Sequence, residues 1–235
     1  MRVGISGTYS SGKTLTAMAL AHLTGIPRTR ARTMREILPL AAPGKRLEEC
    51  TAAELVQMIV VRHVDRAVHE SRLGSSFVSD GTSLQEWIYG TIRVHVGIDP
   101  NASAGRDPSQ AVPPSPELVF FGQVMEQLGM AVKRHVAASF DGVAHLVNEL
   151  PLAVDGHRPV NETFRTMSDD RLRATLTELG IRHVLVAGPV PHRLEQIATA
   201  FGLRAVLGVD DAVRRAHAEY AAMDVRLETL RGAPG

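Results

Sequence analysis

The chain has 235 residues, of which 44% are hydrophobic and 22% charged, with 26 basic against 25 acidic side chains. This composition excludes a disordered, collagen-like or coiled-coil chain and permits one large domain with a buried core. The near-neutral charge lacks the basic excess of a general nucleic-acid binder. The single cysteine, Cys50, excludes an internal disulfide and is typical of a reducing compartment.

These properties predict a cytoplasmic protein with neither a nucleic acid nor a membrane as partner. The apolar stretches fall well short of the roughly 20 residues that a membrane span requires. The first residues lead directly into a glycine-rich loop, without the apolar region of a secretory signal.

Short apolar runs alternate with longer helical patterns along the chain. We predict strands at 3–6, 77–80, 144–147 and 183–187, and helices at 13–23, 51–73, 115–140, 168–179, 192–201 and from 210 onwards. The second helix is predicted from a capping box of Thr51 and Glu54 and from valines at 56, 60, 64 and 68. Strands that alternate with helices predict a three-layer α/β domain around a parallel sheet, with ligands at the carboxyl ends of the strands.

Residues 1–235 are expected to form a single domain. The segment 97–116 is rich in proline and glycine and predicts a long loop, either functional or disordered. In the helix predicted at 210–235, apolar residues recur every three or four positions: Val213, Ala216, Tyr220, Met223, Leu227 and Leu230. This spacing is compatible with packing on the core or a lid, and also with a homodimer seam.

The segment Gly7-Thr8-Tyr9-Ser10-Ser11-Gly12-Lys13-Thr14 matches the phosphate-binding pattern G-x-x-x-x-G-K-[ST] at every fixed position. The glycines let the backbone N–H groups approach phosphate oxygens, and the helix that follows adds its positive end. Lys13 would contact the β- and γ-phosphates, and the Thr14 hydroxyl would be a ligand for Mg²⁺. Without an N-K-x-D guanine-reading element, the nucleotide is expected to be ATP.

Asp80 ends the strand predicted at 77–80. At this place in a P-loop fold, an acid faces Mg²⁺ beside the γ-phosphate and either holds the metal or accepts a proton from an attacking hydroxyl. The alternative is an Asx-turn with Gly81 and Thr82. The residues that follow, among them Glu86 and Trp87, are expected within reach of the same cleft.

Four segments together resemble a known family. They are Gly7–Thr14; Gly25-Ile26-Pro27 with Arg35-Glu36; Asp80-Gly81-Thr82; and Asp155-Gly156-His157-Arg158 with Asn161-Glu162, Phe164-Arg165 and the strand at 183–187. The chain resembles, over residues 1–205, the small P-loop kinases of nucleosides and related molecules, in the group that includes the NadR ribosylnicotinamide kinase domain. That group usually has a glutamate after the proline of its second strand, where this chain has Arg28.

The resemblance implies a three-layer P-loop NTPase fold with a central parallel five-stranded sheet and a helical or loop lid at 152–173. Arg158 and Arg165 would close over the transferred phosphoryl group and stabilise its charge. Arg193 would stack on adenine, or else belong to a plain strand–helix turn. Arg35, Glu36 and Trp87 would contact the phosphate acceptor.

The first functional hypothesis is therefore an ATP- and Mg²⁺-dependent kinase of a small molecule, most plausibly a nucleoside, nucleotide or nucleoside-like metabolite. Lys13, Asp80, Arg158 and Arg165 would be its catalytic residues. The alternative is a nucleotide-dependent regulatory ATPase that acts on a protein partner. A polynucleotide end kinase is disfavoured by the near-neutral charge.

Overall fold

Four parallel strands form the sheet of the described chain. They are β1 (Arg2–Ser6), β2 (Phe77–Asp80), β3 (Gly142–Leu146) and β4 (His183–Val186), in the spatial order β2-β1-β3-β4. In the register of the sheet, Val3 pairs with Val78 on one side and with Gly142 on the other. This computed structural model describes residues 1–104, 111–152 and 161–223, apart from the side chain of Arg35.

The expected fifth strand is reduced to one bridge, so the prediction of five strands is wrong for the described residues. Arg28 pairs with Val78 at the outer edge of β2, through two hydrogen bonds of 2.9 Å that involve the neighbouring Pro27 and Thr29. Pro27 has no N–H group and cannot donate to a longer ladder. The segment therefore follows the edge of the sheet for a single residue pair.

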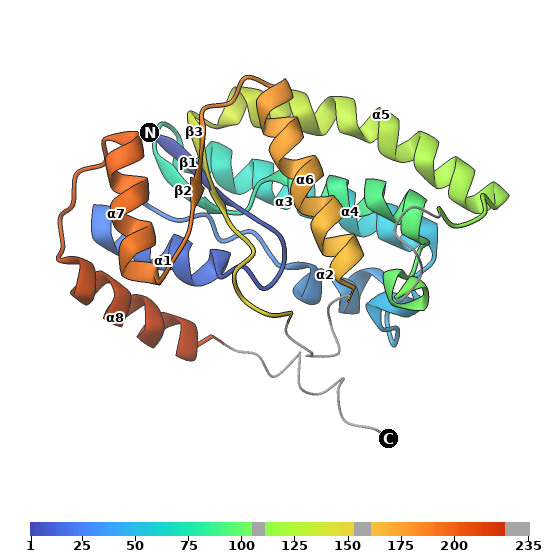
Figure 1. Ribbon diagram of the computed structural model, residues 1–235, viewed down its shortest axis with the longest axis horizontal. Helices are drawn as coiled ribbons and strands as arrows, with labels where there is room; N and C mark the ends of the chain where they lie inside the picture. Colours follow the sequence, from blue (N-terminus) through green and yellow to red (C-terminus); the bar gives the residue numbers. More distant parts are fainter. Residues whose placement is uncertain (105–110, 153–160, 224–235) are drawn as a thin grey trace.

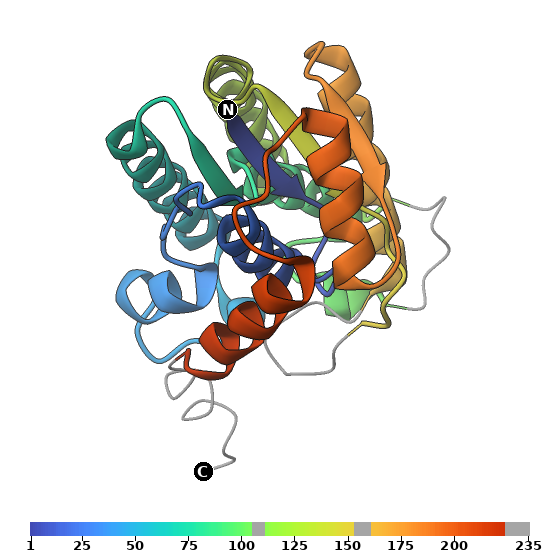
Figure 2. The same cartoon turned by 90° about the vertical axis from the view of Figure 1, so that its left-hand side faces the viewer.

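Helices cover both faces of the sheet, in three layers that Figures 1 and 2 show from two directions. One face packs against α1 (Lys13–Thr24), α7 (Val190–Phe201) and α8 (Val209–Ala221). The other packs against α2 (Met34–Ala41), α3 (Ala52–Leu73), α4 (Ser83–Val96), α5 (Pro116–Ser139) and α6 (Glu162–Glu178). Two short 3₁₀ turns, at Leu47–Glu49 and Pro100–Ser103, connect the helices of this second layer.

The alternation of side chains along the strands produces two separate apolar cores. Val143 contributes to the core under α3, α4 and α5, whereas Ala144 and Leu146 contribute to the core under α1, α7 and α8. Strands buried on both faces consist of short continuous apolar runs, as β1, β2 and β3 do. This explains why these three could be predicted to within two residues. β4 lies at the edge with Leu185 half exposed, but its mostly apolar run His183–Val186 could be predicted equally well.

Three helices differ from the sequence-based expectation. Neither α2 nor α4 is among the helices predicted from the sequence, although α4 begins directly after Asp80-Gly81-Thr82. α6 begins at Glu162, because the side chain of Asn161 accepts a hydrogen bond from the Phe164 N–H, whereas Ser168 lies buried inside the helix. Of the lid expected at 152–173, residues 162–173 thus belong to this packed helix, and residues 153–160 lie outside the described part of the chain.

The buried face of α3 also differs from the prediction. Leu55, Ile59, Arg66 and Glu70 are buried, whereas Val60, Val64 and Val68 are between 38% and 51% exposed.

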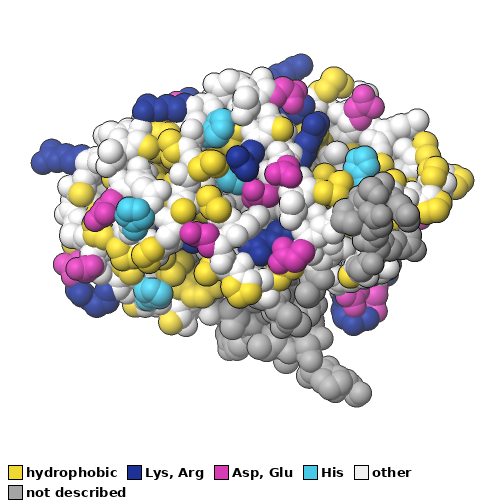
Figure 3. Space-filling view, viewed as in Figure 1, with side chains coloured by type: hydrophobic (Ala, Val, Ile, Leu, Met, Phe, Trp, Pro, Cys, Tyr) yellow, Lys and Arg dark blue, Asp and Glu magenta, His cyan; other side chains and the backbone are white. Residues whose placement is uncertain are grey.

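Acidic and basic side chains are interspersed on the face of the molecule seen in Figure 3. Among the described helices, none is long and apolar enough to cross a membrane.

Candidate functional site

The backbone of the loop between β1 and α1 forms a concave curve. Gly7, Ser10 and Gly12 all have positive φ angles, of 138°, 61° and 87°, and Ser10 is the only such residue other than glycine in the described chain. A Cβ on Gly7 would lie 2.7 Å from the Ser11 hydroxyl and 3.1 Å from the Leu146 carbonyl oxygen. Glycine is therefore required at position 7, and the curl directs successive N–H groups towards a bound anion.

Internal hydrogen bonds hold the base of this loop. The Thr8 hydroxyl donates to Asn148 Oδ1 at 2.6 Å, and the Ser11 hydroxyl donates to the Thr8 carbonyl at 2.8 Å. Lys13 Nζ also donates to that carbonyl, at 2.5 Å. Thr8 and Ser11 are fully buried, so their side chains support the loop while its backbone amides remain the groups suited to phosphate.

Two buried arginines brace the loop from other elements. Arg193, on α7, donates from Nη1 to the Ser11 carbonyl at 2.7 Å and from Nε to the Gly188 carbonyl at 2.6 Å. Arg165, on α6, donates to the Leu150 carbonyl at 2.9 Å and lies 3.4 Å from the Thr8 hydroxyl. Both guanidinium groups support the loop and both side chains are buried, Arg193 at 4% and Arg165 at 3% exposed. Stacking of Arg193 on adenine stays a prediction.

A cavity of about 450 Å³ adjoins the loop and has the volume typical of a small-molecule site. Residues from six helices and several loops line it. They include Tyr9, Lys13, Thr14, Arg62, Arg66, Asp80, Glu86, Tyr89 and Phe164. The cavity thus joins the phosphate-binding residues to a wall built by α3, α4 and α6.

Asp80 lies at the carboxyl end of β2, where it lines the same cavity as Lys13 and Thr14. The turn after it leads directly into α4, because the Thr82 hydroxyl caps that helix and the Gln85 side chain accepts from Thr82 N at 2.6 Å. Carboxylate and hydroxyl oxygens are the ligands that Mg²⁺ prefers. Thr14 and Asp80 are therefore a donor set that fits Mg²⁺ shared with phosphate oxygens.

Three aromatic rings form the apolar wall of the cavity. The Tyr9 ring of the phosphate loop stacks near Phe164, with centroids 6.1 Å apart, and lies 5.7 Å from Tyr89. The Arg93 guanidinium lies over Phe164, 5.4 Å from its centroid. Burial raises the pKa of Tyr9 and Tyr89, so both phenols stay neutral. The wall suits a flat, apolar-faced ring.

A charged cluster lies beside this wall. Arg62 Nε donates to Glu86 Oε1, and Arg66 Nη2 lies 4.0 Å from Glu86 Oε2. Burial opposes ionisation of Glu86, yet the two arginines hold its pKa below the ordinary value. Glu86 is therefore an ionised carboxylate, and its buried Oε2 has no hydrogen-bond donor among the described residues.

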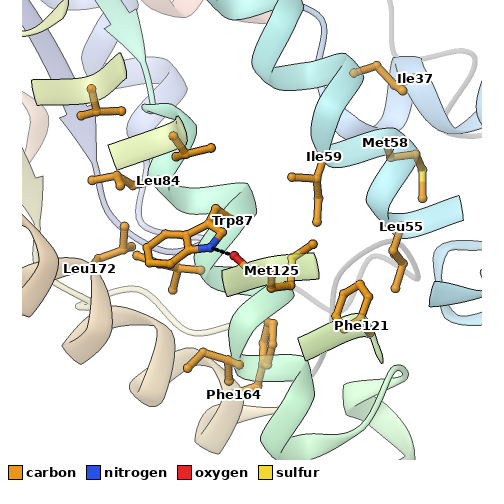
Figure 4. Packing of buried hydrophobic residues seen from close by; sticks show 14 of the residues in the cluster. Ile37, Leu55, Met58, Ile59, Leu84, Trp87, Phe121, Met125, Phe164 and Leu172 are labelled. Carbon is orange, nitrogen blue, oxygen red and sulfur yellow. Dashed lines mark hydrogen bonds between the residues drawn. The ribbon is translucent and has the colours of Figure 1, made fainter. Parts of the chain in front are cut away.

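The residues expected to contact the acceptor divide between the cavity and the core. Glu36 lines the cavity and accepts from the Thr33 backbone N–H at 2.6 Å. Trp87 is 4% exposed, and its Nε1 donates to the Met125 carbonyl at 2.7 Å (Figure 4). Trp87 therefore packs between α4 and α5, away from the cavity lining. The Arg35 side chain and Arg158 lie outside the described residues.

Arg62, Arg66 and Tyr89 carry no motif that would identify them as site residues. One signal is visible in the sequence of α3: Arg62, Arg66 and Glu70 continue the spacing of Leu55 and Ile59 along one helix face. Charged residues on the apolar face of a helix are rarely buried unless they are paired. That pattern indicates a buried polar site.

Comparison with solved structures identifies proteins of the same fold. A NadR protein in complex with NR has a TM-score of 0.56 and 16% identity over 88% of this chain and 51% of its own. A NadR protein in complex with NAD and AMP-PNP has a TM-score of 0.56 and 17% identity, over 86% of this chain and 50% of its own. Deoxyadenosine kinase from M. mycoides with bound dCTP has a TM-score of 0.50 and 13% identity, over 86% of this chain and 99% of its own.

These likenesses confirm that the chain shares the α/β fold of the P-loop kinases that it was expected to resemble, with four parallel strands in the described residues instead of five. The chain spans about half the length of the NadR chains that it matches. No family model and no curated protein matches the chain in sequence.

Proposed function

We propose that this protein is a kinase that transfers the γ-phosphoryl group of ATP, with Mg²⁺, to a small nucleoside-like acceptor. The observation that carries the proposal is the cavity itself, in which Lys13, Thr14 and Asp80 adjoin an aromatic and charged wall. A phosphate loop alone is compatible with any ATPase. A cavity of acceptor size beside it favours group transfer to a small molecule.

The residues of the chain divide the work of such a transfer. The amides of the phosphate loop and Lys13 would bind the phosphates and oppose the charge of the transferred group. Thr14 and Asp80 would hold Mg²⁺, which when bound neutralises charge on the phosphates. Asp80 would also orient the acceptor hydroxyl or accept its proton.

The wall indicates what kind of acceptor the cavity takes. The rings of Tyr9, Tyr89 and Phe164 favour a planar ring. Glu86 Oε2, buried and without a donor among the described residues, favours an acceptor that brings an N–H or O–H group. A nucleoside combines a ring, hydroxyl groups and such donors. The NadR structure with NR and the deoxyadenosine kinase are consistent with this class.

The test measures ADP release from Mg·ATP in the presence of pooled nucleosides, nucleotides and other hydroxylated metabolites. Stimulation by one pool, absent in Lys13→Ala and strongly reduced in Asp80→Asn, is the expected result. Slow release that no pool changes would reject the kinase and favour the alternative, a regulatory ATPase with a protein partner.

A further inference from the structure

A fully buried arginine on α3 lies against the turn that carries Asp80. Arg66 is 1% exposed, and its Nη1 lies within hydrogen-bond distance of three acceptors on that turn. They are the carbonyl oxygens of Asp80 at 2.9 Å and Gly81 at 2.8 Å, and the Ser79 hydroxyl at 3.1 Å. One guanidinium group therefore binds three consecutive residues.

The turn has little freedom once Arg66 is in place. Gly81 has a φ of 84°, and a Cβ at this position would lie 3.3 Å from Arg66 Nη2. From the other side, Gly81 N donates to the Ile5 carbonyl of β1 at 3.0 Å. The peptide that follows Asp80 is thus held between α3 and β1, and the direction of the Asp80 side chain depends on that peptide.

Two buried carboxylates lie around the guanidinium and the turn: Glu86 beside Arg66 itself, and Glu70 on Ser79. Glu86 Oε2 lies 4.0 Å from Arg66 Nη2, and Glu70 Oε1 accepts from the Ser79 hydroxyl at 3.3 Å. Glu70 is in turn held by His135 Nε2, 2.8 Å from its Oε2. A methionine would fill the volume of Arg66 without the cost of burying a charge, so what the charge adds is the hydrogen bonding to the turn.

We propose that Arg66 is a positioning residue, which holds the 79–81 turn so that the Asp80 carboxylate faces the phosphates and their metal ion. The inference rests on the proposed function only in the role that it gives Asp80. Arg66 acts through Asp80 and takes no part in the transfer.

The first experiment measures how strongly Mg²⁺ promotes the binding of a fluorescent ATP analogue. The variants are Arg66→Met and Asp80→Asn, with Arg72→Met as the matched control on the exposed face of the same helix. In Arg66→Met the Mg²⁺ concentration for half-maximal binding should rise about tenfold, the usual cost of losing an outer-shell partner of a metal ligand. Asp80→Asn should show a similar rise, and Arg72→Met none.

A chemical rescue separates positioning from a merely structural role. Arg66 lines the cavity, so ethylguanidinium can enter the space left by Arg66→Ala. Its addition should return the Mg²⁺ concentration for half-maximal binding towards the wild-type value in Arg66→Ala but not in Asp80→Asn. Arg66→Lys, which keeps the charge, should lie between the wild type and Arg66→Met. These two measurements also decide the matter if the methionine variant does not fold.

The outcomes for Arg66 and for the kinase proposal are distinguishable. A wild-type Mg²⁺ dependence in Arg66→Met would overturn the inference, as would an unchanged Asp80→Asn or a failure of both the lysine variant and ethylguanidinium. The expected shifts without stimulation by any acceptor would support the role of Arg66 while rejecting the kinase.

Discussion

The Arg193 guanidinium and the Ser11 carbonyl oxygen are joined by a hydrogen bond of 2.7 Å, although 182 positions separate them in the chain. The bond ties the start of α7 to the phosphate loop. The same guanidinium also binds the Gly188 carbonyl and lies 3.4 Å from Glu149 Oε2. Arg193 therefore connects the loops that follow β1, β3 and β4.

Replacement of Arg193 by methionine should weaken nucleotide binding. The substitution leaves the Ser11 and Gly188 carbonyls without this donor, and the buried Ser11 carbonyl left unpaired costs about 1–3 kcal/mol. We expect about a tenfold loss of ATP affinity and a lower unfolding temperature, measured by titration and by thermal denaturation. Arg204→Met, at an exposed arginine, is the control. Unchanged ATP affinity in Arg193→Met would contradict this role.

Replacement of Glu86 by glutamine should affect the acceptor more than ATP. The variant keeps the shape of the side chain but removes the charge that pairs with Arg62 and that, in the proposed function, would bind a donor group of the acceptor. A hydrogen bond to a charged group is worth about 1.5–3 kcal/mol, so KM for the acceptor should rise roughly 10-fold or more. KM for ATP should rise less, because Glu86 reaches the phosphate side of the cavity only through Arg66, 4.0 Å away. Steady-state kinetics decide this, with Glu178→Gln at the surface as control. Equal changes in both KM values would argue against contact with the acceptor.

The C-terminal helix α8 should influence the choice of acceptor. Tyr220 and Met223 line the cavity, while the neighbouring Glu219 accepts from Arg28 at 2.7 Å and lies 2.9 Å from His22 Nε2. Tyr220 is half exposed, so a ligand that covers it gains about 1 kcal/mol from the ring. Tyr220→Ala should therefore raise KM for the acceptor about fivefold, and Arg214→Ala, on the same helix, should not. No change in the tyrosine variant would show that the acceptor does not reach α8.

Stability should depend on Glu54 in a defined range of acid pH. Lys45 Nζ donates to Glu54 at 2.7 Å and the Thr51 N–H at 2.8 Å, and together they lower the pKa of Glu54 from 4.5 to about 2. The folded state therefore binds this proton more weakly than the unfolded state. The resulting stabilisation is complete above about pH 4.5 and disappears as pH falls towards 2.

Thermal unfolding of Glu54→Gln across this range measures the effect. The variant should unfold at a lower temperature than the wild type at pH 7, and the gap should close between pH 4.5 and 2. Glu126→Gln, at an exposed position of α5, should follow the wild type at every pH. A gap that stays constant down to pH 2 would show that the charge of Glu54 does not contribute.

The strands and the phosphate loop could be predicted because local patterns determine them. The apolar run Val3 to Ser6 is followed directly by a phosphate-loop motif with Gly7, Gly12 and Lys13 at fixed spacing. The structure places this loop between β1 and α1. α4 was not predicted, because its N-terminal cap is formed by Thr82 and Gln85 directly after β2, where the sequence is also compatible with a loop.

The cavity wall could not be predicted from local sequence because tertiary contacts create it. Trp87 and Glu86 are neighbours on α4, yet one is packed in the core and the other lines the cavity. Their directions depend on how α4 lies between α3, α5 and α6. Similarly, Arg165 has the charge expected of a lid residue, but its place on α6 buries the side chain against the phosphate loop.

Tyr9 belongs to the phosphate loop by its backbone and to the acceptor cavity by its ring. A ligand that fixes the ring against Phe164 and Tyr89 also restricts the loop, and a nucleotide that orders the loop also fixes the ring. Such coupling is reciprocal: whatever factor the nucleotide contributes to the affinity for the acceptor, the acceptor contributes to the affinity for the nucleotide. Through the Tyr9 side chain, binding in one part of the cavity would change the binding free energy in the other.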